Sequence, residues 1–144
     1  MQKLPKYKLP IPTEDDEQEA LYRWVSYMLP QYPELENFYH ITNEGKRSVY
    51  EGARLNRSGL IKGMPDLCLP VPHGEYSAVY IELKRRKNGK VEKEQSERLM
   101  KLQKLGNCTA VCYGWEEAKE VLERYIKLPS EVAEKYKAWI KTQK

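Results

Sequence analysis

The sequence predicts a single α/β domain in which a mixed β-sheet is flanked by helices. The chain has 144 residues, enough for one hydrophobic core but hardly for two. Segments with apolar residues at helical spacing alternate with short segments rich in β-branched and aromatic residues, the order expected of helices around one sheet. Hydrophobic residues make up 40% of the chain and charged residues 32%, a composition typical of a globular protein.

The predicted elements are bounded by capping residues, prolines and glycines. Thr13 is a good N-cap, acidic residues fill the turn after it, where the helix dipole favours anions, and Pro30 stops this first helix. Further helices are predicted over residues 48–58, 91–105 and 115–128, and from residue 129 onward. Strands are predicted over residues 38–41, 66–71, 77–84 and 109–113.

These elements divide the chain into three parts. Residues 1–12 contain three prolines and should form an extended lead-in. Residues 13–127 hold the predicted α/β domain, and residues 128–144 form a helical extension at the C-terminus.

Apolar runs and cysteines bear on where the protein resides. No apolar run approaches the ~20 residues of a membrane helix, and the first residues lack the apolar core of a signal peptide. Three cysteines cannot form a closed disulfide set, which fits a reducing compartment. We therefore expect a soluble, cytoplasmic protein with no membrane partner.

Positive charge is unevenly distributed. The formal net charge is +4, yet residues 82–104 hold nine Lys or Arg against four Glu, and residues 46–62 hold five against one. Such segments suit a polyanion such as nucleic acid. For any single segment, a solvated helix face is the simpler explanation.

The segment 77–84 ends with two charged side chains on one face. Because side chains alternate along a strand, Glu82 and Lys84 share the face opposite Val79, Ile81 and Leu83. A charge at the end of a core strand is unfavourable unless it is paired or bound to metal. A Glu-x-Lys pattern alone is a weak signal, and a plain ion pair would also explain it.

A second carboxylate should lie next to this pair. If the two central strands form a hairpin through the proline- and glycine-containing turn between them, Asp66 comes opposite Glu82. Two carboxylates so close repel each other and need a cation, and oxygen ligands suit Mg²⁺ or Mn²⁺ rather than Zn²⁺. His40 and His73 are far apart in the sequence, so no His/Cys cluster competes.

These residues resemble the signature of the PD-(D/E)xK nuclease superfamily, with Pro65-Asp66 followed by Glu82-Leu83-Lys84. More narrowly, residues 13–127 resemble the virus-type replication-repair nuclease (VRR-NUC) domain in its small stand-alone phage form. The matching positions include Thr13-Glu14, Gln18, Trp24, Asn43 to Ser48, Gly52-Ala53-Arg54, Gly59, Gly63 to Leu67, Gln95 and Ala110-Val111-Cys112. The sequence departs from the family at Thr42 and Glu44, where proline and glycine are frequent.

The resemblance implies a restriction-endonuclease-like αβββαβ core followed by a C-terminal helix. It also implies that Asp66, Glu82 and the backbone carbonyl of Leu83 bind the metal. Lys84 would then orient the attacking water, take its proton or stabilise the charge developing on the phosphate. Mg²⁺ uses few protein ligands and keeps several waters, which agrees with so small a set.

Two further site residues follow from the resemblance. Gln95 corresponds to a glutamine that supports the site. In the first helix, the family's spacing to Gln18 and Trp24 selects Glu14 as an additional catalytic carboxylate. Helical geometry offers Glu17 instead, because it continues the apolar stripe of that helix. Both carboxylates could also serve only the helix dipole.

Basic residues before and after the predicted catalytic strand should contact phosphates, which fixes DNA without reading its sequence. We assign this role to Lys46, Arg47, Arg54, Arg85, Arg86 and Lys87. Binding should weaken steeply as salt concentration rises.

The expected function is Mg²⁺- or Mn²⁺-dependent hydrolysis of DNA, by a deoxyribonuclease selective for branched structures such as four-way junctions or flaps. A phage-encoded protein would act in the host cytoplasm. One site per chain favours a homodimer, and the last helix, with Tyr136, Trp139 and Ile140 on one face, is a candidate interface, although packing on its own domain would also explain that face. The alternatives are a non-catalytic nucleic-acid-binding module of the same fold and an enzyme of this fold that acts on another substrate.

Overall fold

The computed structural model describes residues 9–41 and 49–143. Its helices are α1 (Glu14–Met28), α2 (Val49–Arg57), α3 (Lys93–Lys104), α4 (Trp115–Ile126) and α5 (Glu131–Thr142), with a 3-10 helix η1 (Pro33–Asn37) after α1. Its strands are β1 (Tyr39–His40), β2 (Leu67–Leu69), β3 (Val79–Lys84) and β4 (Cys108–Tyr113).

The strands form one mixed sheet in the order β1-β2-β3-β4. β2 is antiparallel to β1 and to β3, whereas β4 is parallel to β3 and is reached through the crossover helix α3. The predicted α/β class, with helices flanking a mixed sheet in the order αβββαβ, is confirmed. In the hairpin Leu67 pairs with Ile81 and Cys68 with Tyr80, so the next position in this register sets Asp66 opposite Glu82, as predicted.

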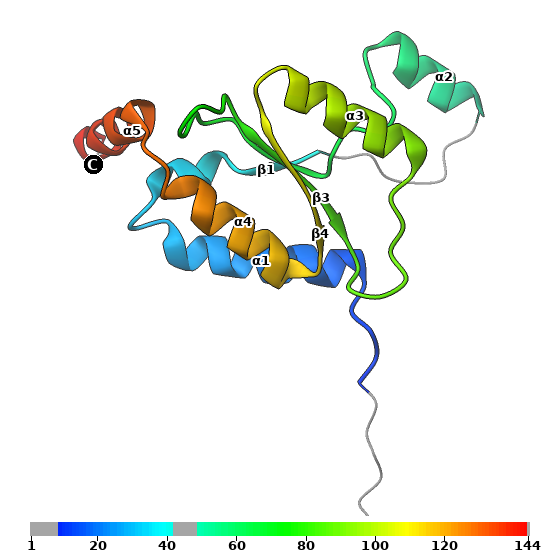
Figure 1. Cartoon of the computed structure of the whole chain (residues 1–144), viewed down its shortest axis with the longest axis horizontal. Coiled ribbons are helices and arrows are strands. Elements are labelled where there is room, and N and C mark those ends of the chain that lie inside the picture. The colour runs from blue at the N-terminus through cyan, green and yellow to red at the C-terminus, as the bar shows by residue number, and fades with distance from the viewer. Residues whose placement is uncertain (1–8, 42–48, 144) are drawn as a thin grey trace, which may run out of the picture.

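Helices cover both faces of the sheet. Figure 1 shows α1 and α4 side by side on one face and α3 on the other, with α2 set apart beyond α3. The core lies between the sheet and the α1–α4 pair. It is built by the inward side chains of β3 together with Leu21 and Val25 of α1 and Leu122 of α4. The opposite face of β3, which carries Glu82 and Lys84, therefore turns toward α3.

Some strands and helices begin or end at other residues than predicted, because side chains there make hydrogen bonds to the backbone. β2 spans three residues instead of six: at its start Asp66 binds β3 through its carboxylate, and after its end Pro70 has no N–H to continue the ladder. α3 begins at Lys93, two residues later than predicted, because Glu92 and Gln95 form a capping box there. α1 begins as expected, with a capping box between Thr13 and Asp16.

The C-terminal helix packs on its own domain. The His73 ring hydrogen bonds through Nδ1 to the carbonyl oxygen of Leu128 at 3.0 Å, and Gly74 donates its N–H to the carbonyl of Pro129 at 2.7 Å, so the β2–β3 turn holds the start of α5. The Tyr136 hydroxyl donates to Glu36 of η1. Trp139 nevertheless stays 52% exposed, and the predicted dimer interface stays a prediction.

Within residues 9–41 and 49–143, no helix combines the length and apolar character needed to span a bilayer.

Candidate active site

The end of β3 buries two opposite charges side by side. Glu82 is 1% exposed and Lys84 7% exposed. Oε1 of Glu82 accepts a hydrogen bond from Nε2 of Gln95 at 2.8 Å and lies 3.4 Å from Nζ of Lys84. The carboxylate is therefore held from its own strand and from α3, which covers this face.

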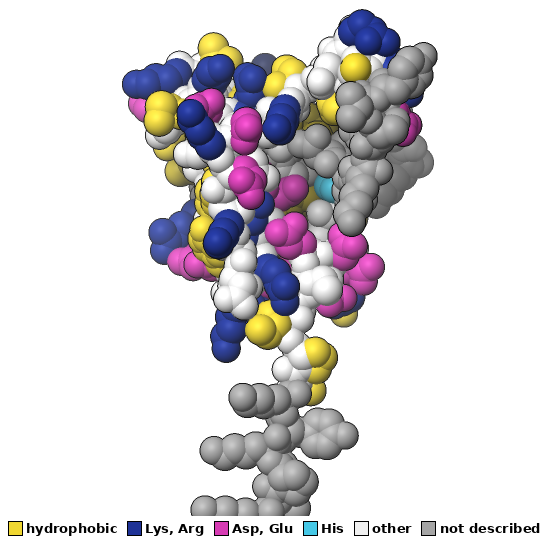
Figure 2. All heavy atoms as spheres, turned by 90° about the vertical axis from the view of Figure 1, so that its right-hand side faces the viewer, with side chains coloured by type: hydrophobic (Ala, Val, Ile, Leu, Met, Phe, Trp, Pro, Cys, Tyr) yellow, Lys and Arg dark blue, Asp and Glu magenta, His cyan; other side chains and the backbone are white. Residues whose placement is uncertain are grey.

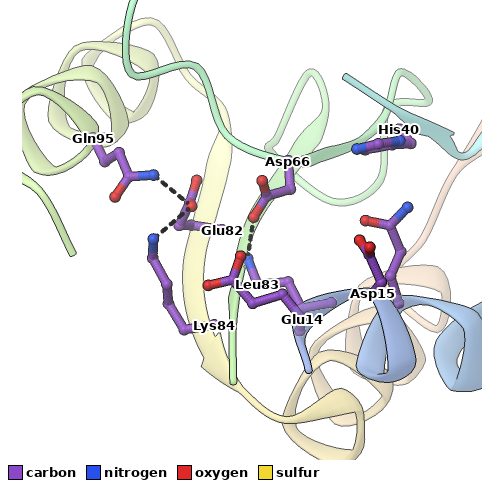
Figure 3. Close-up of a pocket in the computed structure, with 9 residues that line it drawn as sticks. Glu14, Asp15, His40, Asp66, Glu82, Leu83, Lys84 and Gln95 are labelled. Atoms are coloured by element: carbon purple, nitrogen blue, oxygen red, sulfur yellow. Dashed lines mark hydrogen bonds and ion pairs between the residues drawn. The ribbon is translucent and has the colours of Figure 1, made fainter. Parts of the chain in front are cut away.

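The second carboxylate is fixed by the backbone of the same strand. Oδ2 of Asp66 accepts a hydrogen bond from the N–H of Leu83 at 2.8 Å, which points the Asp66 side chain toward the space beside Glu82 (Figure 3). The sequence prediction that Asp66, Glu82 and Lys84 converge at one end of the sheet describes this arrangement.

A cavity of about 200 Å³ opens between these groups. It is lined by residues from both helical layers and from three strand ends: Glu14, Asp15, Gln18, His40, Asp66, Glu82, Leu83, Lys84 and Gln95. Figure 2 faces this side of the molecule and shows acidic side chains and a histidine exposed together, with Lys and Arg side chains to the left of and above them in this view. The site is thus acidic at its centre, with basic side chains on part of its margin.

Gln95 owes its position to a close packing under α3. It is the third residue of the helix, and its Oε1 accepts the N–H of Glu92 at 2.9 Å while its Nε2 reaches Glu82. Beneath it, Gly63 has a φ of +83°, and a Cβ there would lie 2.6 Å from the carbonyl oxygen of Glu94 and 3.0 Å from the nitrogen of Gln95. Only glycine lets the loop before Asp66 approach the helix so closely.

The structure separates the two carboxylates left open in the first helix. Glu14 lines the cavity. Glu17 is 1% exposed and pairs with Arg86, whose Nη2 lies 2.7 Å from its Oε1. The same nitrogen lies 3.1 Å from Oε2 of Glu116 at the start of α4. Glu17 therefore belongs to an ion-pair cluster of α1, α4 and the β3–α3 loop, and of the two candidates it is Glu14 that lines the site.

The carboxylates are crowded enough to change their protonation. Burial and the neighbouring Asp66 raise the pKa of Glu82 from 4.5 to about 8, against the opposing effect of Lys84. Burial also raises the pKa of the Glu14 carboxyl; Lys84 opposes that shift and Asp66 adds to it. Without a cation, full ionisation of all the carboxylates in the site is therefore unfavourable.

A divalent cation fits this donor set. Oε2 of Glu82 is buried without a hydrogen-bond partner among the described residues, although a buried carboxylate oxygen normally has one. The described part of the chain holds no group of three or more His, Cys, Asp or Glu side chains suited to one metal ion. The family resemblance assigns Asp66, Glu82 and the carbonyl of Leu83 as the ligands that would hold a cation, and so small an oxygen set suits Mg²⁺ or Mn²⁺.

The predicted phosphate-contacting residues occupy different environments. Arg54 is exposed on α2, Lys87 is exposed after β3, and Arg85 is half-buried next to Lys84. Arg86 already has two carboxylate partners, so part of its role is to stabilise the fold. Lys46 and Arg47 lie outside the described residues.

Three lining residues were not assigned a role from the sequence. Asp15 and Gln18 flank Glu14 on α1, and helical spacing from Glu14 to Gln18 could have indicated their shared face. His40 enters through the pairing of β1 with β2, which sets it beside the residue that follows Asp66. No local pattern marks His40, because its proximity arises from strands far apart in the sequence.

Fold order and the carboxylate-lined cavity together define a nuclease-type α/β domain. Comparisons with known proteins agree: the family model of the VRR-NUC domain matches residues 12–116. A solved structure described as a VRR_NUC domain protein is 28% identical with a TM-score of 0.71, and the match covers 85% of this chain and 94% of that chain. No curated protein matches the chain. The chain belongs to the VRR-NUC family.

Replacing Glu82 by glutamine should flatten the pH dependence of stability in metal-free protein. Because the folded-state pKa of Glu82 is raised, its contribution to stability is complete below its ordinary pKa of 4.5 and is lost as pH rises through about 8. In EDTA, urea denaturation from about pH 5 to pH 8.5 should show wild-type protein losing more stability than Glu82→Gln. Equal slopes would contradict this, and Glu19→Gln, an exposed change on α1, is the control.

Replacing Gly63 by alanine should displace the start of α3. Positive φ and the clash with Glu94 should lower the free energy of unfolding by more than about 1 kcal/mol. The control is Gly52→Ala in α2, where a Cβ meets nothing within 4 Å and should stabilise by about 0.5–1 kcal/mol. Chemical denaturation measures both, and equal effects would refute the close packing.

Proposed function

We propose that this VRR-NUC protein is a metal-dependent endonuclease that hydrolyses DNA phosphodiester bonds and prefers branched DNA. The observation that carries the proposal is the convergence of Asp66, Glu82 and Lys84 on one cavity at the end of β3. Family membership supports a nuclease in general. The metal, the branched substrate and catalysis itself are the proposal's own content.

Each residue of the site has a task in this proposal. Asp66, Glu82 and the Leu83 carbonyl would hold Mg²⁺ or Mn²⁺, which when bound makes water more acidic and stabilises charge on the phosphate. Lys84 is held by Glu82 with its ammonium at the cavity, where it can orient a water or donate to a phosphate oxygen. Gln95 also donates a hydrogen bond to Glu82 and so helps to fix its carboxylate. Glu14 lines the same cavity from α1.

The charge distribution supports a nucleic-acid substrate. An acidic centre repels phosphate until a cation is bound, while the basic residues on part of the margin attract the DNA backbone. Contacts of this kind follow DNA shape more than base sequence. A homodimer, in which two such sites face the two strands of one junction, is part of the proposal.

A cleavage panel tests the enzyme proposal. Labelled four-way junction, flap and linear duplex are incubated with Mg²⁺, Mn²⁺ or EDTA. Wild-type protein should cut a branched substrate only with metal, and Asp66→Asn should lose at least about 100-fold in rate, because a metal ligand matters at least as much as the groups that orient one. Glu75→Gln, an exposed change in the β2–β3 turn, is the control.

The panel also decides between the two classes of function. Tight binding to DNA without metal-dependent cutting of any substrate would favour the non-catalytic binding module. If linear duplex is cut as fast as junction and flap, the preference for branched DNA is wrong but the nuclease activity stands. Size measurement in solution, with and without junction, tests the homodimer.

Two neighbouring basic residues should respond differently to salt. Lys87→Gln should lower the slope of log affinity against log salt by about 1, as for a lost phosphate contact. Arg86→Gln should leave this slope nearly unchanged but lower the denaturation midpoint, because it leaves the buried Glu17 without its partner. DNA binding in EDTA over a salt series measures this slope. If Arg86→Gln also lowers the slope by about 1, Arg86 contacts DNA and the distinction between the two residues is wrong.

A further inference from the structure

One side of the cavity carries a histidine that the proposed chemistry does not use. His40, the last residue of β1, lines the cavity together with Asp15 and Gln18 of α1. Figure 3 shows its ring beyond Asp66, on the side away from Lys84, directed into the space above Asp15. The cavity therefore extends on both sides of Asp66.

His40 is held firmly in this place. Its backbone pairs with Leu67, and the N–H of Ile41 donates to the carbonyl of Asp66 at 2.7 Å, which ties the end of β1 to the residue that carries the catalytic carboxylate. On the other side, the Tyr22 hydroxyl donates to the carbonyl of Phe38 at 3.0 Å, and the two rings stack with centroids 5.3 Å apart. β1 is thus fixed to both β2 and α1.

Hydrogen-bond donors on this side are few. Among the described residues that line the cavity, four are carboxylates: Glu14, Asp15, Asp66 and Glu82. The donors Lys84 and Gln95 both contact Glu82. On the α1 side of Asp66, the lining side chains that bear N–H groups are Gln18 and His40. A phosphodiester that passes over Asp66 would bring a phosphate oxygen next to Glu14 and Asp15 on this side, where an N–H donor offsets the repulsion from these carboxylates.

We propose that His40 donates a hydrogen bond to an oxygen of the scissile phosphate group, on the side of Asp66 away from Lys84. This makes His40 a further residue that contacts the substrate, and the inference rests on the proposed nuclease function. An imidazole ring suits this contact, because it carries an N–H donor when neutral and two when protonated. Donors that are fixed before the reaction stabilise the transition state most effectively.

Three substitutions at His40 test this contact. In single-turnover cleavage of the preferred branched substrate with saturating protein and Mg²⁺, His40→Ala should slow cleavage by about 100-fold, the lower end of the range for loss of one transition-state donor. His40→Gln and His40→Asn each keep an amide N–H donor, and at least one should recover about 10-fold of that loss. DNA affinity in EDTA should change by less than about 3-fold in all three, because the contact acts in the transition state.

The control is Tyr39→Phe, a change on the adjacent position of β1, which points to the other face of the sheet and should cleave at the wild-type rate. Wild-type cleavage with an unaffected His40→Ala would overturn this inference alone. So would an equal loss in all three His40 variants, or failure of all three to fold in thermal denaturation, since His40 would then be structural. Absence of cleavage by wild-type protein would overturn the proposed function and this contact with it.

Discussion

The central constraint in this structure is the close approach of two carboxylates at one end of strands β2 and β3. The hairpin register sets Asp66 against Glu82, and burial then makes full ionisation of both unfavourable. Three neutral or cationic groups offset this: the N–H of Leu83, the amide of Gln95 and the ammonium of Lys84. They satisfy one oxygen of each carboxylate and leave Oε2 of Glu82 without a partner among the described residues. The fold thus holds the two carboxylates together without satisfying all of their oxygens.

The surrounding elements hold this unfavourable arrangement from outside the cavity. On one side, the close approach of Gly63 to α3 fixes Gln95. On the other, Arg86 joins the buried Glu17 of α1 to Glu116 of α4, and this cluster lies one helical turn from Glu14. Neither Gly63 nor Arg86 lines the cavity itself. Their common effect is to fix the starts of α1 and α3, the two helices whose first turns contribute side chains to the site.

How far the sequence reaches can be seen from individual residues. The convergence of Asp66, Glu82 and Lys84 followed from strand alternation and a symmetrical hairpin, because both rules depend only on local spacing. Local helical spacing left Glu14 and Glu17 open and only the family resemblance selected Glu14, because the physical reason, the pairing of Glu17 with Arg86, comes from a distant loop. His40 was missed for a related reason: β1 is two residues long, and its register with β2 exists only in the folded chain. Local sequence patterns do not show which residues from distant segments come into contact.

The same distinction applies to the positive charges. Counted along the sequence, residues 84–87 are four consecutive basic side chains and suggest one continuous phosphate-binding surface. In the folded chain they divide: Lys84 is buried against Glu82, Arg86 binds two carboxylates, and Lys87 is exposed. β3 ends at Lys84 and the chain turns at Arg86 and Lys87, so this run of like charges is distributed between the site, the fold and the solvent. Net charge of a segment therefore overstates the number of its residues available to DNA, and the partners of each side chain decide which of them can bind it.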